Sequence, residues 1–520
     1  MKRQVALTIV KLVRLSCGRW ATRSISFPFC LPVPATNLTG CKLRLWLKPL
    51  AVSFHAVTSP HIACLGDASR NMDWSTIAPS PPLRWGESWT LSCSRKKGNR
   101  MSFSITIGRE ENSCARGLTA HSLPRPSDYH ERDANSAGEI ATIALYGEFG
   151  PPILTAARSL NEAGLEVVVL GIGSGKPSVW SNAVSRAELM RPDDVGTPAG
   201  ISVLNDFIQR TKAQALLAFW EPHMLWLAAN RDLLHQSCKL LMSSKEPLQA
   251  IQSKRDQVSI ARHAGFSILP TWELFQKSDL CRIDPSAYPV CVRPSAPREV
   301  RPPFKAEMLE SPSMLESFLE GRAWGPGPLL VQPFLPLPTV VIHGVRSESG
   351  ELLVLESFIA TMRFQAITLE LRPFPMEAKI AECCRKFVDE VGLTGPFHFD
   401  LLYSVETNAF HFLEINPRLG GTTDKVFRLG FDEPLWTLAA YGFDVRARRY
   451  SAPGGRSVVN RRSVLKHMFW VIRGRLSPLD YPLVGPFRHL LLSLHCLLGA
   501  KDSITSAKDL RGTWWLYTGH

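Results

Sequence analysis

Two carboxylates and one amide lie within a segment that is otherwise apolar and aromatic, residues 397–418, with the sequence FHFDLLYSVETNAFHFLEINPR. Two runs rich in aromatic residues flank a short polar stretch around Thr407, a pattern that predicts a β-hairpin. Because side chains alternate along a strand, Glu414 and Asn416 are expected on one face. Pairing that is symmetrical about Thr407 would place Asp400 opposite Glu414.

This arrangement predicts a metal site. Opposed side chains on paired strands have Cβ atoms roughly 5 Å apart, so Asp400 and Glu414 would repel each other unless a cation intervened. Their oxygen atoms suit a hard divalent cation, and Mg²⁺ with phosphate as co-ligand is the natural candidate. The alternative is a solvent-facing strand with hydrated carboxylates. The apolar neighbours Phe412, Leu413 and Ile415 favour the metal site, since an unpaired buried glutamate is costly.

The elements before this hairpin fall into two stretches. In the first, apolar runs alternate with helical patterns, which predicts a parallel, Rossmann-like α/β sheet. Its strands are expected at 140–146, 166–170 and 215–220, and its helices at 153–160, 200–211 and up to about 248. The loop at 147–152 lacks a full G-x-G-x-x-G, so a scaffold role is favoured over a dinucleotide site.

In the second stretch, from residue 249, strands predominate. We expect helices at 254–264, 313–320 and 376–391, and strands at 289–295, 329–334, 339–346 and 352–359.

Three features together resemble the ATP-grasp superfamily. They are Lys254 at the start of a helix, Arg293 in the strand PVCVRPS, and L-E-I-N-P-R at 413–418 with Asp400 fourteen residues before Glu414. The sequence is most similar to the carbamoyl-phosphate-synthetase-like carboxylate–amine ligases. The resemblance covers roughly residues 141–445 and is most specific over 397–421.

The resemblance implies a mixed α/β and α+β fold, with a pre-ATP-grasp Rossmann-like half-domain followed by a two-lobed ATP-grasp domain. The expected division is a disordered or non-native extension (1–136), the pre-ATP-grasp domain (137–248), the ATP-grasp N-lobe (249–330), the C-lobe (331–445) and a helical C-terminal extension (446–520).

The resemblance also implies roles for individual residues. Asp400, Glu414 and Asn416 would ligate Mg²⁺, or alternatively Mn²⁺, with Glu414 bridging two ions that hold the phosphates of ATP. Arg418 would stabilise charge on the transferring phosphoryl group, so Arg418 and Glu414 are the expected catalytic residues. The implied ATP-binding positions are Lys254, Arg293, Gln332, Pro333 and Leu335. The alternatives are exposed surface cations for the two basic residues and a plain strand crossing for 332–335.

The implied activity is that of an ATP-dependent C–N bond-forming ligase. Mg-ATP would phosphorylate a small-molecule carboxylate, and an amine would attack the acyl phosphate to form an amide or peptide-like bond. Two features depart from the family's pattern: the loop at 296–303 has no glycine, and the acidic residue that usually holds the ribose is absent, with Thr339 near its position. They motivate the alternative of a catalytically weak or inactive ATP-binding regulatory protein.

The charge of the chain is concentrated at its N-terminus. The 520 residues have a net charge of +14, but residues 1–136 hold 19 basic and 8 acidic side chains, so the remainder carries only +3. A nucleic-acid partner is therefore not expected. Residues 1–66 have nine basic and no acidic residues, a composition that leaves organelle targeting open, although a stretch that is not native coding sequence is favoured.

The sequence contains no run of about 18 apolar residues that could span a bilayer, and we expect a cytoplasmic protein. For residues 446–520, helices that pack on the ligase lobe are favoured over a membrane-surface helix at 484–499.

Overall fold

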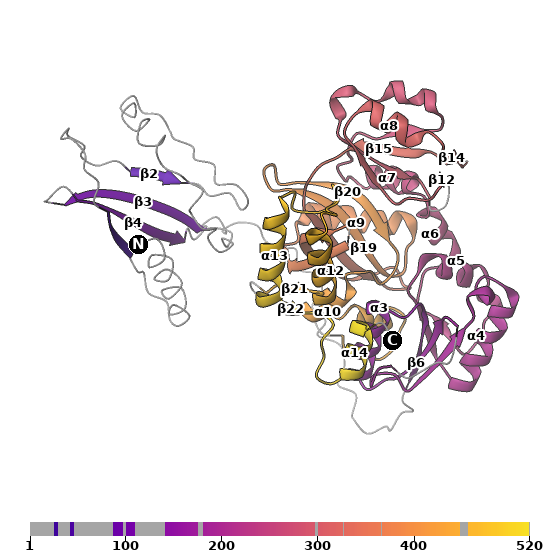
Figure 1. Cartoon of the computed structure of the whole chain (residues 1–520). Coiled ribbons are helices and arrows are strands. Elements are labelled where there is room, and N and C mark those ends of the chain that lie inside the picture. The colour runs from indigo at the N-terminus through magenta and orange to yellow at the C-terminus, as the bar shows by residue number, and fades with distance from the viewer. Residues whose placement is uncertain are drawn as a thin grey trace. The chain divides into compact units, whose positions relative to one another are not determined.

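The computed structural model describes residues 25–29, 42–45, 87–96, 100–109, 141–174, 180–296, 300–325, 327–365, 367–447 and 456–518. The chain divides into two compact units, Met1–Ala134 and Asn135–His520 (Figure 1).

The first unit contains a four-stranded antiparallel sheet in the order β1-β4-β3-β2. Its strands are β1 (Ile25–Phe29), β2 (Lys42–Leu45), β3 (Glu87–Lys96) and β4 (Arg100–Arg109). The disorder predicted through residue 136 is not found at these strands, and the rest of that prediction lies outside the described residues. The signal was present in the sequence: Trp89, Leu91 and Cys93 alternate with small polar residues, which is the period of a strand.

The second unit begins with the expected parallel sheet, in the order β7-β6-β5-β8-β9. The strands are β5 (Thr142–Gly147), β6 (Glu166–Ile172), β7 (Arg186–Met190), β8 (Ala215–Ala218) and β9 (Lys239–Leu240); the helices are α3 (Pro151–Glu162), α4 (Pro198–Thr211), α5 (Glu221–Ala229) and α6 (Lys245–Ala250). Alternate residues of β5 face opposite sides, so Ile143 and Leu145 pack with α3 while Ala144 and Tyr146 pack with α4. Because both faces are covered, the strands are apolar throughout.

A smaller lobe follows, with a four-stranded antiparallel sheet in the order β10-β15-β11-β13 (Figure 1). Its elements are α7 (Lys254–His263), β10 (Trp272–Leu274), β11 (Val290–Pro294), β13 (Glu307–Leu309), α8 (Pro312–Leu319) and β15 (Leu329–Pro333); β12 (Val300–Arg301) and β14 (Ala323–Trp324) form a separate pair. This sheet has a core of its own, which includes Val290, Val292 and Leu315. The lobe is thus an independently packed layer.

The larger lobe is built on a seven-stranded sheet in the order β20-β19-β16-β17-β18-β21-β22. Its elements are β16 (Thr339–Arg346), β17 (Leu352–Phe364), β18 (Ile367–Pro373), α9 (Ala378–Val391), β19 (Gly395–Ser404), β20 (Ala409–Asn416), α10 (Thr423–Leu429) and α11 (Glu433–Ala440). Helix α9 ends at Gly392, whose φ of 71° lies in the left-handed region that glycine adopts readily. The helix packs Phe387 against Phe399 and Phe412 of the hairpin, which holds the two carboxylate-bearing strands in place.

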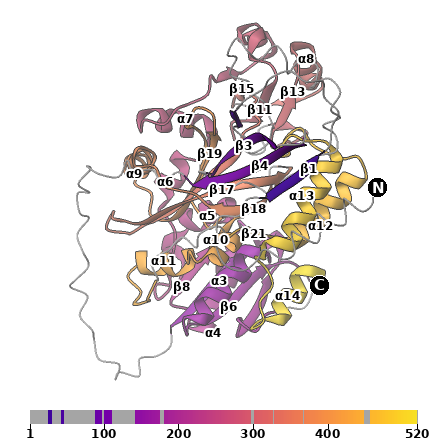
Figure 2. The ribbon, with the colours of Figure 1, turned by 90° about the vertical axis from the view of Figure 1, so that its left-hand side faces the viewer.

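The C-terminal segment contributes strands as well as the expected helices. Its elements are β21 (Val458–Val459), α12 (Arg461–Ile472), α13 (Pro486–Gly499), β22 (Lys501–Asp502) and α14 (Leu510–Thr518). Strands β21 and β22 extend the seven-stranded sheet, and α12 and α13 lie side by side beyond it (Figure 2). Helix α14 instead packs on the core of the parallel sheet through Leu516. No helix in the described part of the chain is long and apolar enough to cross a membrane.

Candidate functional site

The hairpin of β19 and β20 has the predicted pairing at its carboxylates. Asp400 lies opposite Glu414, and His398 lies opposite Asn416. Nearer the turn the register differs by one residue, and a bulge that leaves Leu413 without a partner absorbs the difference. Without this bulge Asp400 would face Leu413. The bulge therefore brings the two carboxylates together, a common use of bulges at functional sites.

Lys254 reaches one carboxylate of this pair, Glu414, from the smaller lobe. It is the first residue of α7, and its Nζ forms an ion pair with Oε2 of Glu414. The helix start is fixed in turn by a 2.8 Å hydrogen bond from the backbone N of Lys254 to the carbonyl of Ser295. Both side chains of the ion pair keep just over a quarter of their surface exposed, 28% for Lys254 and 29% for Glu414. The pair is therefore accessible to a ligand.

The two carboxylates differ in their electrostatic environment. The charge of Lys254 holds the pKa of Glu414 well below its usual range, and the Asn416 amide adds to this effect. Burial, and then the charge of Glu414, raise the pKa of Asp400. Such a split between two adjacent carboxyl groups is expected when only one of them has a cationic partner.

Arg293 joins the smaller lobe to the bulge. Its Nη2 donates to the carbonyl of Leu413 at 3.1 Å and to Oε1 of Gln332 at 3.2 Å. Gln332 is oriented by a 2.9 Å hydrogen bond from its Nε2 to Oγ1 of Thr271. Arg293 is only 8% exposed, so the alternative of a surface cation is wrong for this residue.

Arg418 reaches in the opposite direction, to the parallel-sheet domain. Its Nε donates to Oε1 of Glu221 at 3.0 Å, and its Nη1 donates to the carbonyl of Leu419 at 3.3 Å. Glu221 opens α5 and was not singled out from the sequence, where Glu-Pro at a helix start is an ordinary pattern. Glu221 of the parallel-sheet domain thus binds Arg418, the arginine that is expected to act on the phosphoryl group.

A buried polar network underlies the hairpin. His343 shares 2.9 Å contacts with Oε1 of Glu433 through Nδ1 and with Oγ1 of Thr422 through Nε2, and Thr423 donates to Glu433 Oε2 at 2.8 Å. The ring of His343 stacks on His398 at 5.3 Å. This network was not predicted from the sequence, although a histidine inside the apolar run VVIHGV is a signal for a buried polar group.

Arg363 is a further basic residue near the carboxylates. Its Nη1 donates to Oγ1 of Thr339 and its Nη2 to the carbonyl of Leu337 at 2.8 Å. Its charge is among those that act to lower the pKa of Asp400. Thr339 thus accepts a hydrogen bond from an arginine.

The segment 332–335 leaves the end of β15 and leads toward β16. Pro333 lies opposite Val290 of β11, and Phe334 N donates to the carbonyl of Pro289 at 2.7 Å. The carbonyl of Leu335 accepts from Leu337 N at 2.8 Å. These contacts fix the path of the connection between the two lobes, and its role in adenine binding stays a prediction.

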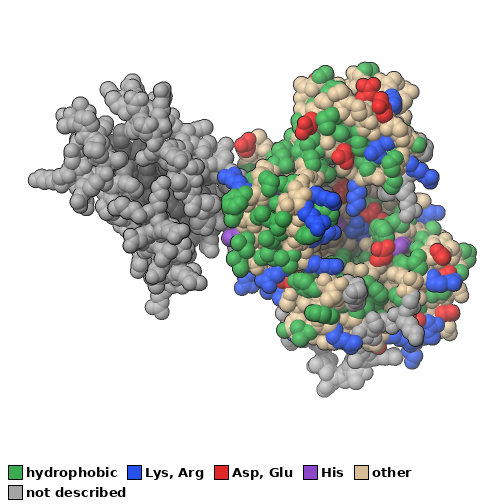
Figure 3. All heavy atoms as spheres, in the orientation of Figure 1, with side chains coloured by type: hydrophobic (Ala, Val, Ile, Leu, Met, Phe, Trp, Pro, Cys, Tyr) green, Lys and Arg blue, Asp and Glu red, His purple; other side chains and the backbone are tan. Residues whose placement is uncertain are grey.

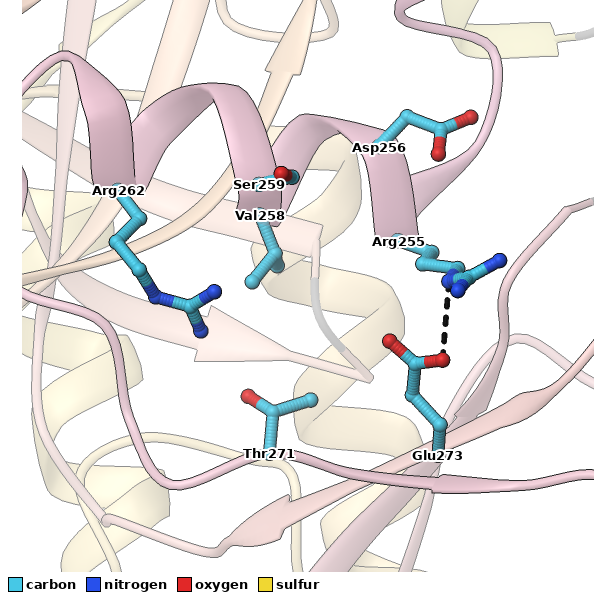
Figure 4. A pocket seen from close by; sticks show the side chains of 7 residues that line it. All are labelled: Arg255, Asp256, Val258, Ser259, Arg262, Thr271 and Glu273. Carbon is cyan, nitrogen blue, oxygen red and sulfur yellow. Dashed lines mark ion pairs between the residues drawn. The ribbon is translucent and has the colours of Figure 1, made fainter.

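A cavity of about 330 Å³ lies between α7 and the strand β10 that follows it (Figure 4). It is lined by Arg255, Asp256, Val258, Ser259, Arg262, Thr271 and Glu273, and a 2.9 Å ion pair joins Arg255 to Glu273 across it. It contains none of the residues expected at the site. Figure 3 shows instead a hollow between the smaller lobe and the rest of the second unit, with basic and acidic side chains facing into it.

The donor set fits a magnesium ion. Within the described ranges no group of three or more His, Cys, Asp or Glu side chains could hold a metal. The predicted donors at the hairpin are two carboxylates, Asp400 and Glu414, and the amide of Asn416. Mg²⁺ is commonly bound by one or two carboxylates together with substrate phosphates, and it needs no complete protein cage. The electrostatic conflict between Asp400 and Glu414 is what such an ion would relieve.

No family model and no curated protein sequence matches the chain. Among solved structures, the ADP complex of purK, an N5-carboxyaminoimidazole ribonucleotide synthetase, is similar with a TM-score of 0.50 and 14% identity, over 64% of this chain and 85% of that one. Biotin carboxylase from Campylobacter jejuni has a TM-score of 0.47 and 16% identity, over 59% and 72%. L-amino acid ligase from Bacillus licheniformis has a TM-score of 0.45 and 14% identity, over 61% and 78%.

Proposed function

Because the chain has the ATP-grasp fold, we propose that it is a ligase that uses Mg-ATP to activate a small-molecule carboxylate as an acyl phosphate, which an amine then attacks. The product would be an amide or peptide-like bond. The fold alone does not specify this chemistry, so the proposal depends on the residues of the site.

One observation carries the proposal: Asp400 and Glu414 face each other across the bulged hairpin, and Lys254 reaches Glu414 from the other lobe. Paired oxygen donors beside a lysine are the groups needed to bind a metal ion and the phosphates of a nucleotide together. A plain structural ion pair would not need the second carboxylate.

The proposed roles follow from these positions. Asp400, Glu414 and Asn416 would hold Mg²⁺, which when bound would draw charge from the phosphate oxygens. Lys254 would exchange its contact with Glu414 for one with a phosphate, and Arg418 would likewise leave Glu221 to stabilise charge on the transferring group. Arg293 would support the bulge, and the backbone of 332–335 would contact adenine. Chemistry of this kind depends on positioning and charge, so it needs no protein nucleophile.

Phosphate release from ATP over a panel of carboxylates and amines, measured with the full chain and Mg²⁺, tests the proposal. We expect release above the background for at least one pair, and formation of the corresponding amide by mass spectrometry. Calorimetry with Mg-ATP should be run beside it. The absence of both nucleotide binding and turnover would contradict the proposal.

A second candidate is a catalytically weak or inactive ATP-binding regulatory protein. The glycine-free loop at 296–303 favours it, because glycine lets backbone N–H groups approach phosphates closely. Nucleotide binding by calorimetry without phosphate release for any acceptor would support this candidate over the ligase.

Lys254→Met is expected to weaken ATP binding about hundredfold, since a charged hydrogen bond to a phosphate would be lost. Arg255→Met is the matched control, because Arg255 is the next residue of α7 and is also ion-paired, but its partner is Glu273 and not a residue of the hairpin (Figure 4). Calorimetry with Mg-ATP should show little change for the control. An equal loss in both variants would indicate damage to α7 and not the loss of a phosphate contact.

Magnesium affinity is expected to depend on pH through Asp400. Burial and the charge of Glu414 raise the pKa of Asp400 to about 7, so this carboxyl group is protonated below that pH and can ligate only above it. The affinity should therefore rise as the pH is increased through neutrality and then level off. Asp400→Asn should bind more weakly and lose this dependence.

Calorimetric titrations of Mg²⁺ in the presence of a non-hydrolysable ATP analogue measure this effect. Titration of the nucleotide itself is common to both proteins, so the difference between wild type and Asp400→Asn isolates the carboxyl group. Parallel pH profiles for the two proteins would contradict the assignment of Asp400 as a ligand.

A further inference from the structure

Within the described residues of the second unit, helices α12 and α13 present an apolar outer surface. Both helices bury one face against strands β17, β18 and β21 of the seven-stranded sheet, through residues such as Val464 and Cys496. The opposite faces expose large apolar side chains at helical spacing, each between 41% and 79% exposed. They are Leu465, Phe469 and Ile472 on α12, and Phe487, Leu491, Leu494 and Leu498 on α13. We call these seven residues the apolar patch, and Figure 3 shows hydrophobic side chains gathered over these helices.

The exposed charges of residues 456–518 all have one sign. The exposed basic residues on the two helices and the chain beside them include Arg462, Lys466, Arg473, Arg475, Arg488 and Lys501. Residues 456–518 contain three acidic side chains, and all three are buried, at 3% exposure for Asp480, 4% for Asp502 and 2% for Asp509. Each of the three carboxylates accepts a hydrogen bond from a backbone N–H group, so their oxygen atoms are bound inside the fold. The outer surface is therefore apolar and basic.

From this combination we infer that α12 and α13 dock on an anionic lipid bilayer. An amphipathic surface of this kind lies in the interface, with its apolar side chains at the acyl boundary and its cations at the level of the phosphates. The long stems of lysine and arginine allow that arrangement. The guanidinium of Arg473 lies 4.1 Å from the ring centre of Phe469, so a cation and an apolar ring are already paired on the patch.

The charge argues against two other occupants from the same chain. A second copy would bring an equally basic surface against this one. The N-terminal stretch, residues 1–136, carries 19 basic and 8 acidic side chains and so has the same sign. Nucleic acid would match the charge but would gain little from seven exposed aliphatic and aromatic side chains. The bilayer surface satisfies both properties, and it requires no membrane-spanning helix.

Cosedimentation of the full chain with vesicles tests the inference. Vesicles of phosphatidylcholine alone are compared with vesicles of phosphatidylcholine and phosphatidylserine. We expect binding only to the vesicles that contain phosphatidylserine, and we expect this binding to weaken as the salt concentration is raised. No binding to either kind, or equal binding to both, would overturn the inference. The inference would also be overturned if the wild type were a dimer in sedimentation equilibrium and the substitutions Phe469→Ser, Phe487→Ser and Leu494→Ser together made it a monomer.

Two variants and a control assign the binding to this surface. The patch variant Phe469→Ser, Phe487→Ser, Leu494→Ser should partition at least about tenfold less, and the charge variant Arg462→Gln, Lys466→Gln, Arg488→Gln about hundredfold less. The control Leu233→Ser, Met314→Ser removes equally exposed apolar residues elsewhere and should bind like the wild type. Unchanged thermal unfolding midpoints would show that the variants are folded. Wild-type binding by the patch variant, or equal losses in the control, would overturn the inference. The result is independent of whether the chain is a ligase.

Discussion

Glu414→Ala is expected to abolish ATP-dependent phosphate release, with a loss of about 10³-fold or more. Glu414 is the carboxylate that stays ionised, because Lys254 holds its pKa below the usual range. Asp400 cannot replace it, since it extends from the neighbouring strand and would have to hold the ion without the second carboxylate. The loss should appear in turnover and in the magnesium dependence of nucleotide binding.

The variant should remain folded. Glu414 and Lys254 are both partly exposed, so breaking their ion pair is expected to change the free energy of unfolding by less than about 1 kcal/mol. Removing Glu414 also removes a negative charge that raises the pKa of Asp400, which offsets part of the cost.

Glu406→Ala is a matched control, because Glu406 is an exposed glutamate in the turn of the same hairpin. It should retain full phosphate release. Full activity in Glu414→Ala, with the unfolding transition unchanged, would refute the metal-site assignment and with it the proposed ligase mechanism.

The sequence was most informative where residue types that can bind a metal ion lie on a clear strand pattern. Asp400 and Glu414 lie on a strong strand pattern, so the pairing of these two residues could be predicted from the sequence alone. That prediction assumed symmetry about Thr407, and it holds at the carboxylates only because of the bulge at Leu413. A bulge depends on tertiary contacts such as the one from Arg293, which periodicity does not encode.

Contacts between segments that are far apart along the chain could not be predicted from the sequence. Nothing in the sequence around Glu221 indicates Arg418, which lies 197 positions away. His343 and Glu433 are likewise 90 residues apart, and their burial follows from the packing of α11 on the sheet. For α13, the apolar residues could be recognised in the sequence. The burial of every acidic residue in 456–518, which leaves the surface basic, is a property of the fold and could not.

The sequence likewise could not predict the contact between the C-terminal segment and the parallel-sheet domain. Arg158 of α3 is buried, and its Nε donates to Oδ2 of Asp509 at 2.8 Å. The other guanidinium nitrogens donate to the carbonyl of Ile504 at 2.5 Å and to Oγ1 of Thr513 at 3.0 Å. Asp509 in turn accepts from the backbone N of Asn182 at 2.9 Å. One arginine therefore satisfies acceptors in α14 and in the chain that leads into it.

Arg158→Ala is expected to lower the free energy of unfolding by about 3–5 kcal/mol, because it leaves Asp509 charged and buried without its cationic partner. Lys508→Ala is the control: Lys508 also bridges to this domain, through Glu162 at 3.6 Å, but it is 78% exposed and should contribute less than about 1 kcal/mol. Urea unfolding followed by fluorescence measures both.

The effect of Arg158→Ala should also depend on pH. Burial opposes the ionised form of Asp509, but hydrogen bonds from Asn182, Gly512 and Arg158 together lower its pKa. A lowered pKa stabilises the fold above the unfolded value near 3.9, and that contribution is lost as the pH falls through the folded value. Arg158→Ala should therefore lose part of this acid-sensitive contribution, so its stability should fall less steeply than that of the wild type below about pH 4. Equal losses for Arg158→Ala and Lys508→Ala would show that the buried ion pair does not hold the C-terminal segment on the parallel-sheet domain.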